Sequence, residues 1–374
     1  MKVLHVHRAY LPYGGGSARR ISSLLEAGVA FEGYEQHVLV TRNGVPASSP
    51  DEEVIRGIRV FRLDDWRRIP LRARALHRAH GYDVLHFHSP RDLFFCAGFL
   101  RGIPRVVESH GVSEMGRVKR WLANASFRAA DRVVVLSEAA REWLSADAGL
   151  DSARVHVVAN GIDYDRFLEP GEVAAPLPLA AAPGKLVGYV GTMYAWQGIF
   201  ALADAFACAL GRDPDLRLLY VGDGPDLARL REHVDGLGVG DRVGFVGHVP
   251  PAAAAAYLRA IDLFAMLRPA ERLTDLATPL KIFEVGVSGT PLVVSPRPAL
   301  LEVGGERPED HFFVQEDLSA QAAGARLAAL LAPAMRAERS GRARAFRARL
   351  LASDASWTAR ARQLREIYRL VTGR

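Results

Sequence analysis

Lys281 and Glu284 are the two charged residues of an otherwise apolar stretch, 277–295, with the sequence ATPLKIFEVGVSGTPLVVS. If this stretch begins as a helix, Lys281 lies in the first turn, where free backbone N–H groups already favour an anion. Glu284 lies one turn later and can accept hydrogen bonds from sugar hydroxyls. The pair therefore predicts a site for a phosphorylated sugar compound, such as a sugar nucleotide. The alternative is an ordinary helix that carries two solvated charges.

The residues around that pair predict a helix, a turn and a buried strand. Thr278 is a good N-cap, and Pro279 suits the first turn because its missing N–H would be unpaired there anyway. Apolar residues recur at helical spacing from Leu280 onward. Gly289 can adopt the left-handed conformation that ends a helix, and 292–295 has the β-branched character of a central parallel strand. This order is typical of an α/β fold.

Glycine turns follow three successive predicted strands in the second half of the chain. They are VGTMYAWQG at 190–198, VGDGP at 221–225 and VGH at 246–248. Glycines there let the backbone approach a flat or phosphorylated ligand. One such turn is weak evidence, but three on one edge of a sheet predict a binding surface. In the first half, GGGS at 14–17 follows the first strand and opens a helix, where N–H groups can hold an anion; a flexible loop is the alternative.

His110 ends a strand of the first half, in the sequence ESHG at 108–111. A histidine at the carboxyl end of a parallel strand is placed for a ligand-binding edge, whereas a core histidine would lie in mid-strand. His86 and His88 end the preceding strand, and we interpret them as polar strand-end residues. A zinc cluster is conceivable, but the spacing matches no known metal motif, so we predict no metal.

The stretch 66–78, WRRIPLRARALHR, carries five arginines and no acidic residue. It predicts a basic helix that faces an anionic partner, with Arg67 and Arg68 as acceptor-binding candidates. That partner is either a membrane surface that presents a lipid-linked acceptor or a phosphate group on a soluble acceptor. A solvated surface helix is the alternative.

Strand and helix patterns alternate along the whole chain, with a Pro/Ala-rich stretch at 169–183. We expect two Rossmann-like α/β domains that face each other across a cleft, with ligands beyond the carboxyl ends of the strands. The expected domains are 1–168 and 184–354, with 169–183 as linker. The segment 355–374 has an apolar stripe that suits a closing helix.

The composition of the 374 residues is that of a globular protein, with 49% hydrophobic and 24% charged residues. No run of 18 apolar residues suggests a membrane-spanning helix, and the start of the chain has no signal-peptide pattern. Two cysteines form no disulfide framework, so we expect a cytoplasmic protein. The net charge of +6 fits an anionic partner such as a nucleotide, a phosphate or a membrane surface. Only four of the 48 basic residues are lysines, which makes Lys281 more notable.

Seven motifs follow one another along the chain: the glycine loop, ESHG, NGID, VGTMYAWQG, VGDGP, FVGHV and PLKIFEVGVSGTPLVV. As an ordered set they resemble the motifs of the retaining GT-B glycosyltransferases of family 4. The resemblance covers nearly the whole chain. It implies that the first domain binds the acceptor and the second binds a nucleotide sugar, and that the final helix crosses back to the first domain. It also implies transfer with retention and without a metal or other cofactor.

The resemblance assigns roles residue by residue. His110 matches the histidine that contacts the donor sugar near its 6-hydroxyl, and Glu284 matches the glutamate that holds the ribose. The remaining donor-binding positions in loops and turns are Gly15, Gly16, Gly191, Thr192, Gln197, Gly222, Gly224, Val246, Gly247, Thr278 and Leu280.

This chain departs from the family pattern at its best-known charged positions. Thr192 and Gln197 stand where members commonly carry the Arg and Lys that grip the diphosphate, and Leu276 replaces the first Glu of the E-x7-E element. We therefore expect Lys281, with the helix N-terminus, to neutralise the diphosphate. Arg268 and Arg272 are second candidates for this role, and Asp275 for part of the role of the missing Glu.

The sequence thus predicts transfer of a hexose-type sugar from a UDP-, GDP- or dTDP-sugar to an acceptor hydroxyl, in glycan, glycolipid or glycosylated-metabolite biosynthesis. The acceptor is lipid-linked or soluble, and a lipid-linked one would bring peripheral contact with the cytoplasmic face of a membrane. No nucleic-acid partner is expected. The alternatives are a nucleotide-sugar hydrolase or epimerase of the same fold, and an inert sugar-nucleotide-binding homologue. A dehydrogenase is disfavoured because GxGxxG with its ribose-binding acid is absent.

Overall fold

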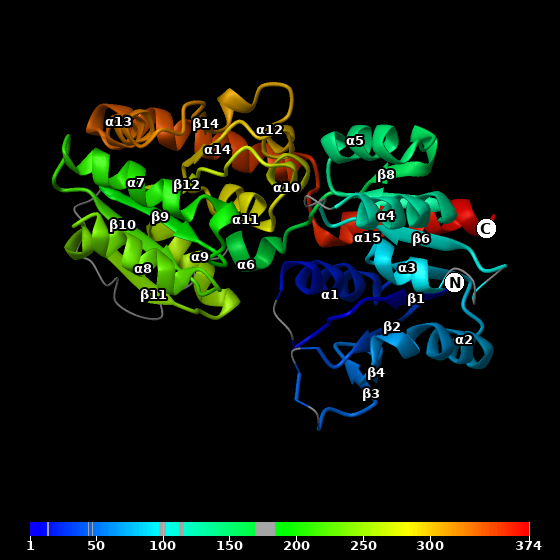
Figure 1. Ribbon diagram of the computed structural model, residues 1–374. Helices are drawn as coiled ribbons and strands as arrows, with labels where there is room; N and C mark the ends of the chain where they lie inside the picture. Colours follow the sequence, from blue (N-terminus) through cyan, green and yellow to red (C-terminus); the bar gives the residue numbers. More distant parts are fainter. Residues whose placement is uncertain are drawn as a thin grey trace. The chain divides into compact units, whose positions relative to one another are not determined.

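The computed structural model describes residues 1–12, 15–43, 45–46, 48–96, 100, 102–111, 116–168 and 184–373. They form two compact units, Met1–Gly161 with Ser356–Arg374, and Ile162–Ala355 (Figure 1). Each unit contains a largely parallel sheet with helices packed on it. The predicted fold class of two Rossmann-like α/β domains is confirmed.

The sheet of the first unit has eight strands in the order β3-β4-β2-β1-β5-β6-β7-β8. All neighbours are parallel except the hairpin β3–β4. The strands are β1 (Lys2–Val6), β2 (Glu35–Thr41), β3 (Glu52–Ile55), β4 (Ile58–Leu63), β5 (Val84–Phe87), β6 (Arg105–Glu108), β7 (Arg132–Val135) and β8 (Val155–Val157). The central strands are buried, as their apolar sequences predict.

The helices of the first unit include the closing helix of the chain. They are α1 (Gly16–Gly28), η1 (Trp66–Arg68), α2 (Ile69–His80), α3 (Pro90–Cys96), α4 (Arg117–Ala129), α5 (Glu138–Ala148), η2 (Ser152–Arg154) and α15 (Trp357–Thr372). Helix α15 packs against α1 and buries the stripe formed by Ala361, Leu364, Ile367 and Tyr368. This periodic stripe is therefore the reason why the end of the chain joins the first unit.

The sheet of the second unit has six parallel strands in the order β11-β10-β9-β12-β13-β14. The strands are β9 (Leu186–Val190), β10 (Arg217–Val221), β11 (Val243–Gly247), β12 (Leu263–Met266), β13 (Leu292–Val294) and β14 (Phe313–Val314). Because neighbouring parallel strands end on the same edge, the turns after β9, β10, β11 and β12 lie beside one another.

Short helical turns and longer helices connect these strands. They are α6 (Tyr164–Leu168), η3 (Ala195–Gln197), α7 (Ile199–Leu210), α8 (Leu227–Gly236), η4 (Gly240–Arg242), α9 (Pro251–Ala260), α10 (Arg272–Leu276), α11 (Leu280–Ser288), α12 (Pro298–Gly304), η5 (Pro308–Asp310), α13 (Ala320–Leu331), η6 (Pro333–Met335) and α14 (Arg336–Ala352). Gly286 of α11 lies so close to α14 that an added Cβ would come within 2.6 Å of Phe346 and Leu350.

The first unit ends at Gly161, earlier than the 168 expected from the sequence. Residues after it pack in the second unit because Phe167 of α6 is buried in that unit's core and the Tyr164 hydroxyl donates to the Leu350 carbonyl at 2.7 Å. The expected linker, 169–183, lies outside the described residues. Among the helices that the structure describes, none combines the length and apolar character needed to cross a membrane.

Candidate functional site

The glycine turns after β9, β10 and β11 form one connected platform in the second unit. The Gly191 N–H donates to the Val221 carbonyl at 2.9 Å, and the Gly222 N–H donates to the Gly247 carbonyl at 2.8 Å. The structure therefore brings together the three turns that the sequence singled out. Val246 and Gly247 end β11 and are partly exposed on this platform.

Two of these glycines are required by close backbone approach. At Gly222, with φ +130°, an added Cβ would lie 1.9 Å from the Gly191 carbonyl oxygen. At Gly224 it would lie 2.6 Å from the backbone nitrogen of Met193. A side chain at either position would push the turns apart, so the platform depends on glycine. Thr192, between these turns, is exposed.

Arg268 links this platform to the segment before α11. It follows β12, and its Nε and Nη2 atoms donate to the Gln197 Oε1 atom at 3.0 and 2.8 Å. Its Nη1 atom donates to the Ala277 carbonyl at 3.0 Å. Because Oε1 of Gln197 accepts both of these bonds, the amide NH2 group of Gln197 faces the other way and is presented as a donor.

Arg268 is only 1% exposed, and no carboxylate of the described residues lies within ion-pair distance of it. Its guanidinium also stacks on Trp196, with 5.0 Å from Cζ to the ring centroid. Burial lowers its pKa to about 10, so it stays protonated at neutral pH. A buried cation held only by neutral oxygen atoms leaves an uncompensated positive potential at the carboxyl edge of the sheet.

Lys281, in the first turn of α11, forms an ion pair with Glu284, three residues later. Their side chains are only 15% and 6% exposed. The sequence assigned them to separate ligand groups, the diphosphate and the ribose, whereas the structure joins them. A ligand that contacts both side chains must therefore either bind to the intact ion pair or break it.

The start of α11 differs by one residue from the expectation. The N-cap is Pro279, with no side-chain cap, and the helix begins at Leu280, which is partly exposed. Thr278 is buried and donates instead to the Ala299 carbonyl at 3.3 Å. Packing against α12 thus overrides the capping preference of threonine. Nearby, Asp275 forms an ion pair with Arg297 at 3.2 Å, which leaves it less able to replace the missing glutamate.

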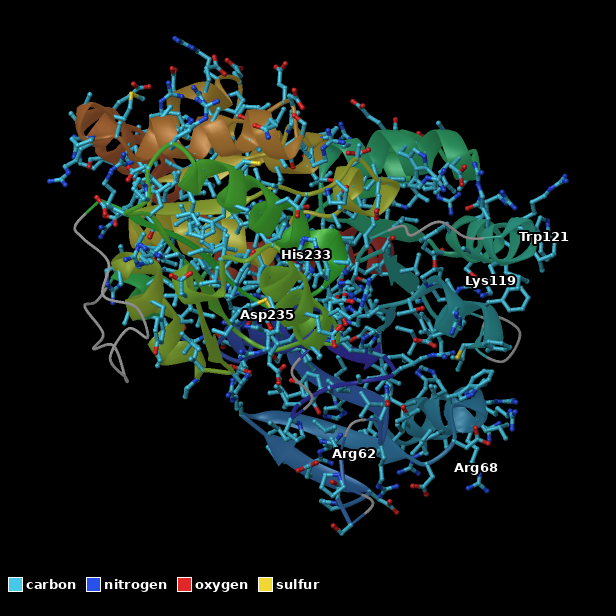
Figure 2. All side chains as sticks on the ribbon, turned by 60° about the vertical axis from the view of Figure 1, so that its left-hand side comes forward. Arg62, Arg68, Lys119, Trp121, His233 and Asp235 are labelled. Atoms are coloured by element: carbon cyan, nitrogen blue, oxygen red, sulfur yellow. The ribbon has the colours of Figure 1, made fainter. Side chains whose placement is uncertain are left out.

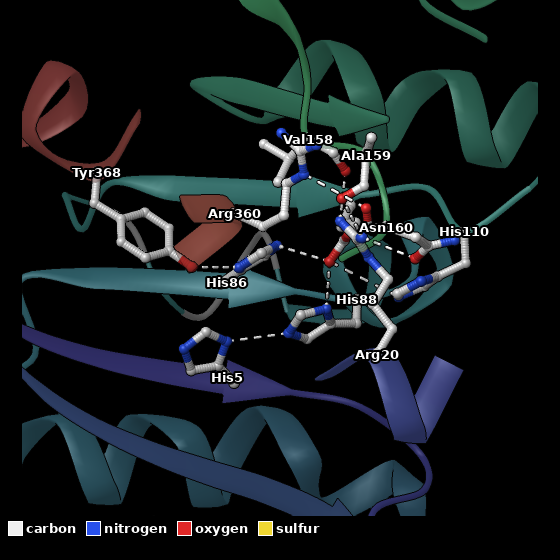
Figure 3. Close-up of polar contacts among 11 residues, drawn as sticks. His5, Arg20, His86, His88, His110, Val158, Ala159, Asn160, Arg360 and Tyr368 are labelled. Atoms are coloured by element: carbon white, nitrogen blue, oxygen red, sulfur yellow. Dashed lines mark hydrogen bonds and ion pairs between the residues drawn. The ribbon is translucent and has the colours of Figure 1, made fainter. Parts of the chain in front are cut away.

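In the first unit, a buried ion pair joins three of the sequence motifs. The Arg20 Nε atom donates to Glu108 Oε1 at 2.7 Å, which connects α1 to the end of β6 (Figure 3). Arg20 also donates to the Val158 and Ala159 carbonyls and to Asn160 Oδ1, at 2.7, 3.0 and 3.0 Å. The glycine loop, ESHG and NGID therefore meet at one guanidinium.

Histidines surround the other oxygen of Glu108. His88 Nδ1 lies 2.7 Å from Glu108 Oε2, and its Nε2 lies 3.0 Å from His5 Nδ1. His86 Nδ1 lies 2.5 Å from the hydroxyl of Tyr368 on α15 (Figure 3). His86 and His88, which we interpreted from the sequence as polar strand-end residues, are almost fully buried at the end of β5. The reason is that α15 and the Arg20–Glu108 pair cover this edge of the sheet and supply hydrogen-bond partners.

His110 lies at the accessible end of this cluster. Its Nε2 atom is buried and faces Glu108 Oε2 at 3.9 Å, while 18% of its side chain is exposed. Burial lowers the pKa of His110 to about 4, so its imidazole is neutral at pH 7. Burial alone would raise the pKa of Glu108, but Arg20 and the histidines hold it well below its usual value. The result is a buried carboxylate that pairs with Arg20, beside the neutral ring of His110.

Two sets of these side chains offer potential metal-ligand atoms within 4.8 Å of one another: His5, His86 and His88, and His88, Glu108 and His110. The rings of His86, His88 and His110 stack on one another rather than converge, with interplanar angles of 28° and 25°. The carboxylate is also engaged by Arg20. This geometry suits a hydrogen-bonded network better than a tetrahedral metal site.

Gly15 and Gly16 form the start of α1, with Gly15 as the N-cap. Ser17 of this turn lies 3.3 Å from His7 Nε2, and the His7 ring lies 6.0 Å from that of His110. The described part of the glycine loop therefore lies near His110, within the same unit. Residue 14, the first of its glycines, lies outside the described residues.

Arg67 and Arg68 lie on η1, which Asp65 caps, and both are exposed. Arg67 stacks over Trp66 at 5.8 Å, and Arg8 approaches the same ring at 5.0 Å. In the part of the chain that the structure describes, neither arginine forms a hydrogen bond or an ion pair with the cluster around Glu108. Sequence reasoning gave no role to Arg20 and named Glu108 only as the first residue of ESHG, and the one available signal was an arginine shortly after a glycine loop.

Comparison with known proteins identifies the family. The family model described as Glycosyltransferase Family 4 matches residues 14–166, and the model described as Glycosyl transferases group 1 matches residues 184–332. The chain belongs to the family 4 glycosyltransferases of GT-B fold. The resemblance seen in the motifs is thereby confirmed. The two matches correspond to the two units, since the first contains strands β2 to β8 of one sheet and the second contains all the strands of the other.

The names of two relatives of this glycosyltransferase give different acceptors. A GDP-mannose:cellobiosyl-diphosphopolyprenol alpha-mannosyltransferase of Xanthomonas campestris is 27% identical over 65% of this chain and 66% of its own length. A D-inositol 3-phosphate glycosyltransferase of Rhodococcus opacus is 28% identical over 99% of this chain and 90% of its own. The first three relatives are matched over 66%, 38% and 60% of their own lengths, so the chain spans less than two thirds of each.

Solved structures of the same fold cover the whole chain. Sucrose-phosphate synthase from Thermosynechococcus elongatus superposes with a TM-score of 0.81 and 20% identity, over 100% of this chain and 99% of the other. At this level of identity the likeness shows the fold and leaves the substrates open.

Proposed function

We propose that this glycosyltransferase transfers a hexose-type sugar from a nucleotide diphosphate sugar to an acceptor hydroxyl, with retention of configuration. The observation that carries the proposal is the buried Arg268, which has no carboxylate partner among the described residues, beside the glycine platform. A cation buried without a counter-ion is costly unless an anion joins it. A diphosphate is an anion that fits a surface of backbone N–H groups and glycine turns.

Gln197 is proposed to contact the diphosphate in place of the usual lysine. Its amide NH2 group is oriented outward by the two hydrogen bonds from Arg268 to its oxygen. The positive charge of Arg268 then attracts the diphosphate from behind Gln197, because the distance is short and the buried surroundings have a low dielectric constant. Gln197 is neutral and stands where other family members commonly carry a lysine, but Arg268 keeps the electrostatic potential at this position positive.

Lys281 is proposed to add the second positive charge, and Glu284 to accept from the ribose hydroxyls. As the bond to the sugar breaks, negative charge develops on the leaving diphosphate. Fixed cations and N–H dipoles directed at that charge stabilise the transition state. The acceptor hydroxyl attacks from the same face, with the leaving phosphate as the proton acceptor, so no pair of carboxylates must flank the bond.

His110 is proposed to contact the transferred sugar. Since its Nε2 atom faces the Glu108 carboxylate, the neutral ring is expected to carry its proton on Nε2 and to present Nδ1 as an acceptor. A hydroxyl of the sugar is a donor that fits this nitrogen. Gly15 and Gly16 are proposed to supply N–H groups near the donor phosphates, and Arg67 and Arg68 to bind the acceptor.

Assays with defined donors and acceptors test the proposal. UDP-, GDP- and dTDP-linked glucose and mannose are each incubated with a polyprenyl-diphosphate-linked disaccharide or with inositol 3-phosphate, acceptor types found in the names of the two relatives. We expect acceptor-dependent release of nucleoside diphosphate, and an α-linked product from an α-linked donor by NMR.

The other outcomes separate the alternatives. An inverted product would contradict retention. Turnover that is equally fast without any acceptor would indicate a nucleotide-sugar hydrolase or epimerase. Donor binding by calorimetry without turnover on any acceptor would indicate an inert binding protein.

A further inference from the structure

A surface on the first unit combines exposed apolar side chains with a row of basic residues. We call it the apolar–basic face, and it is formed by η1, α2, α3 and α4. Its large apolar residues are Leu71, Phe94, Phe95, Val118 and Trp121, which are 63%, 38%, 40%, 71% and 62% exposed. Half of the large apolar residues that are exposed in the described structure lie on these few elements, which marks the face as unusual.

The start of α4 projects furthest from the unit. All residues from 116 to 121 are exposed, whereas a helix packed on a sheet normally buries one side of every turn. Val118 and Trp121 are three residues apart and therefore point to the same side of this turn. Lys119 and Arg117 flank them and form no ion pair with any described residue. The turn thus presents an aromatic and an aliphatic side chain between two cations.

Packing connects this turn to the basic stretch that the sequence singled out. Helix α3 packs on α4, and Phe95 of α3 lies 4.7 Å from Trp66 of η1, measured between ring centroids. Phe94 lies 5.7 Å from Phe95. In Figure 2, Arg68, Lys119 and Trp121 lie along the same side of the first unit. The face is therefore continuous from η1 to α4.

The charge of the face has a single sign. Helix α2 and η1 together carry five arginines and no acidic residue, and α4 carries three arginines and one lysine with no acidic residue. The one acid of α3, Asp92, is buried and pairs with Arg8 at 3.1 Å. Arg120 is partly neutralised by Asp147 of α5. The remaining cations surround the exposed apolar side chains without local compensation from these helices.

We propose that the apolar–basic face docks on the surface of an anionic lipid bilayer. Apolar and aromatic tips enter the boundary between headgroups and acyl chains while arginines and lysines bind the phosphates, as in interfacial helices. A polyanion without an apolar phase, such as a nucleic acid, would leave Val118, Leu71 and Trp121 in water. The proposal depends on the exposure and charge of the first unit alone, and it stands apart from the transfer reaction.

Vesicle co-sedimentation of the full chain, without any sugar nucleotide, tests the proposal. The probes are vesicles of phosphatidylcholine alone and of phosphatidylcholine with about 30% phosphatidylglycerol. The test variant is Arg117→Glu with Lys119→Glu, and a second variant is Val118→Ser with Trp121→Ser. The matched control, Arg362→Glu with Arg369→Glu and Leu370→Ser, makes the same change of charge and replaces a 59% exposed leucine, all at exposed positions on α15 of the same unit.

We expect binding to the anionic vesicles only, weakened by salt, because each cation near such a surface contributes separately to partitioning. The charge-reversal variant should lower the partition coefficient by roughly tenfold or more, and the control should keep it within about twofold. Trp121→Phe should remove most of the blue shift in tryptophan emission that accompanies binding. All substituted residues are exposed, so circular dichroism should show a folded chain.

Three results would overturn the proposal. The first is no binding to anionic vesicles. The second is an equal loss of binding in the α4 variants and in the α15 control, which would indicate that the net charge of the chain acts without a defined face. The third is lipid-independent self-association, seen by light scattering and abolished by Val118→Ser with Trp121→Ser, which would assign the face to a second copy of the chain.

Discussion

The two buried arginines of this protein have opposite electrostatic environments. Arg20, in the first unit, is 2% exposed and pairs with the fully buried Glu108 at 2.6 Å. Arg268, in the second unit, is 1% exposed; among the described residues it donates hydrogen bonds only to the amide oxygen of Gln197 and to a carbonyl, and it stacks on Trp196. Arg20 therefore belongs to a neutral pair, whereas Arg268 leaves a net charge in its surroundings.

The difference separates a structural role from a binding role. A buried pair with all its hydrogen bonds made gains little from an added anion, and breaking it is costly. A buried cation without a carboxylate has already lost its hydration, and an anionic ligand is the partner that compensates it. Removing Glu108 should therefore mainly reduce stability, whereas removing Arg268 should mainly reduce ligand binding.

The largest effect is expected for Glu108→Ala. This substitution leaves Arg20 buried and unpaired and removes the partner of His88, so it should lower the free energy of unfolding by about 3–5 kcal/mol. Urea denaturation of this variant and of Glu306→Ala, an exposed control, measures the effect. A loss below about 1 kcal/mol would mean that the pair is not structural.

Lys281→Ala probes the more accessible cation of the second unit. The loss of one preorganised positive group at the leaving diphosphate should lower kcat by roughly a hundredfold, or about 3 kcal/mol of transition-state stabilisation. Because the Glu284 side chain is only 6% exposed, the loss of its partner should also lower the free energy of unfolding, so kcat is measured where circular dichroism shows that the variant is folded. Near-normal turnover in this variant would leave Arg268 and Gln197 as the groups that carry the diphosphate charge.

The histidine cluster should make the first unit sensitive to acid. Burial lowers the pKa of His110 to about 4 and the pKa values of His5, His7 and His86 well below 6.5. The unfolded chain therefore binds more protons than the folded chain between pH 6.5 and about 4, so stability falls as pH falls through this window. His110 alone should contribute a loss of about 2 kcal/mol between pH 7 and pH 5.

Urea denaturation of the wild type and of His110→Gln at both pH values isolates that contribution. The wild type should lose more stability on acidification than the variant does. An equal loss in the two proteins would mean that His110 is not held neutral by the fold.

Glu284→Gln should have the smallest effect. Whether it weakens binding or leaves binding unchanged or stronger depends on the ligand. The loss of charge-assisted bonds to the ribose should weaken nucleoside diphosphate binding by roughly tenfold, or about 1.5 kcal/mol. Pyrophosphate has no ribose, and Lys281 loses its ion-pair partner in this variant, so pyrophosphate affinity should be unchanged or higher. Calorimetry with both ligands, and with Glu232→Gln as an exposed control, separates the two effects. Parallel loss with both ligands would contradict a ribose-specific role.

The sequence was sufficient to predict the features of the fold that depend on the spacing of residues close together in the chain. Alternating strand and helix patterns predicted the fold class, and glycines after β9, β10 and β11 predicted turns that the structure joins into one platform. Thr278 was misassigned as a cap by local preference, because its hydroxyl reaches the Ala299 carbonyl, 21 residues away.

The decisive electrostatics could not be predicted, because they depend on contacts between residues far apart in the chain. Arg20 and Glu108 are 88 residues apart, and Arg268 and Gln197 are 71 residues apart. Arg268 stood only as a second candidate for the diphosphate, since the sequence carries no sign that it is buried or that it orients Gln197. The burial of His86 and His88 was likewise not predicted, because Tyr368 of α15, the hydrogen-bond partner of His86, comes 282 residues after it.

Calorimetric titration of Arg268→Met with inorganic pyrophosphate tests the central claim most directly. Pyrophosphate carries the diphosphate charge without a base or a sugar, so the result does not depend on which donor is used. Methionine keeps much of the buried volume without the charge, and Arg20→Met serves as the matched control. We predict that Arg268→Met lowers pyrophosphate affinity by roughly tenfold or more while its Tm stays near that of the wild type, and that Arg20→Met lowers the Tm. Unchanged pyrophosphate affinity in a folded Arg268→Met protein would contradict the account.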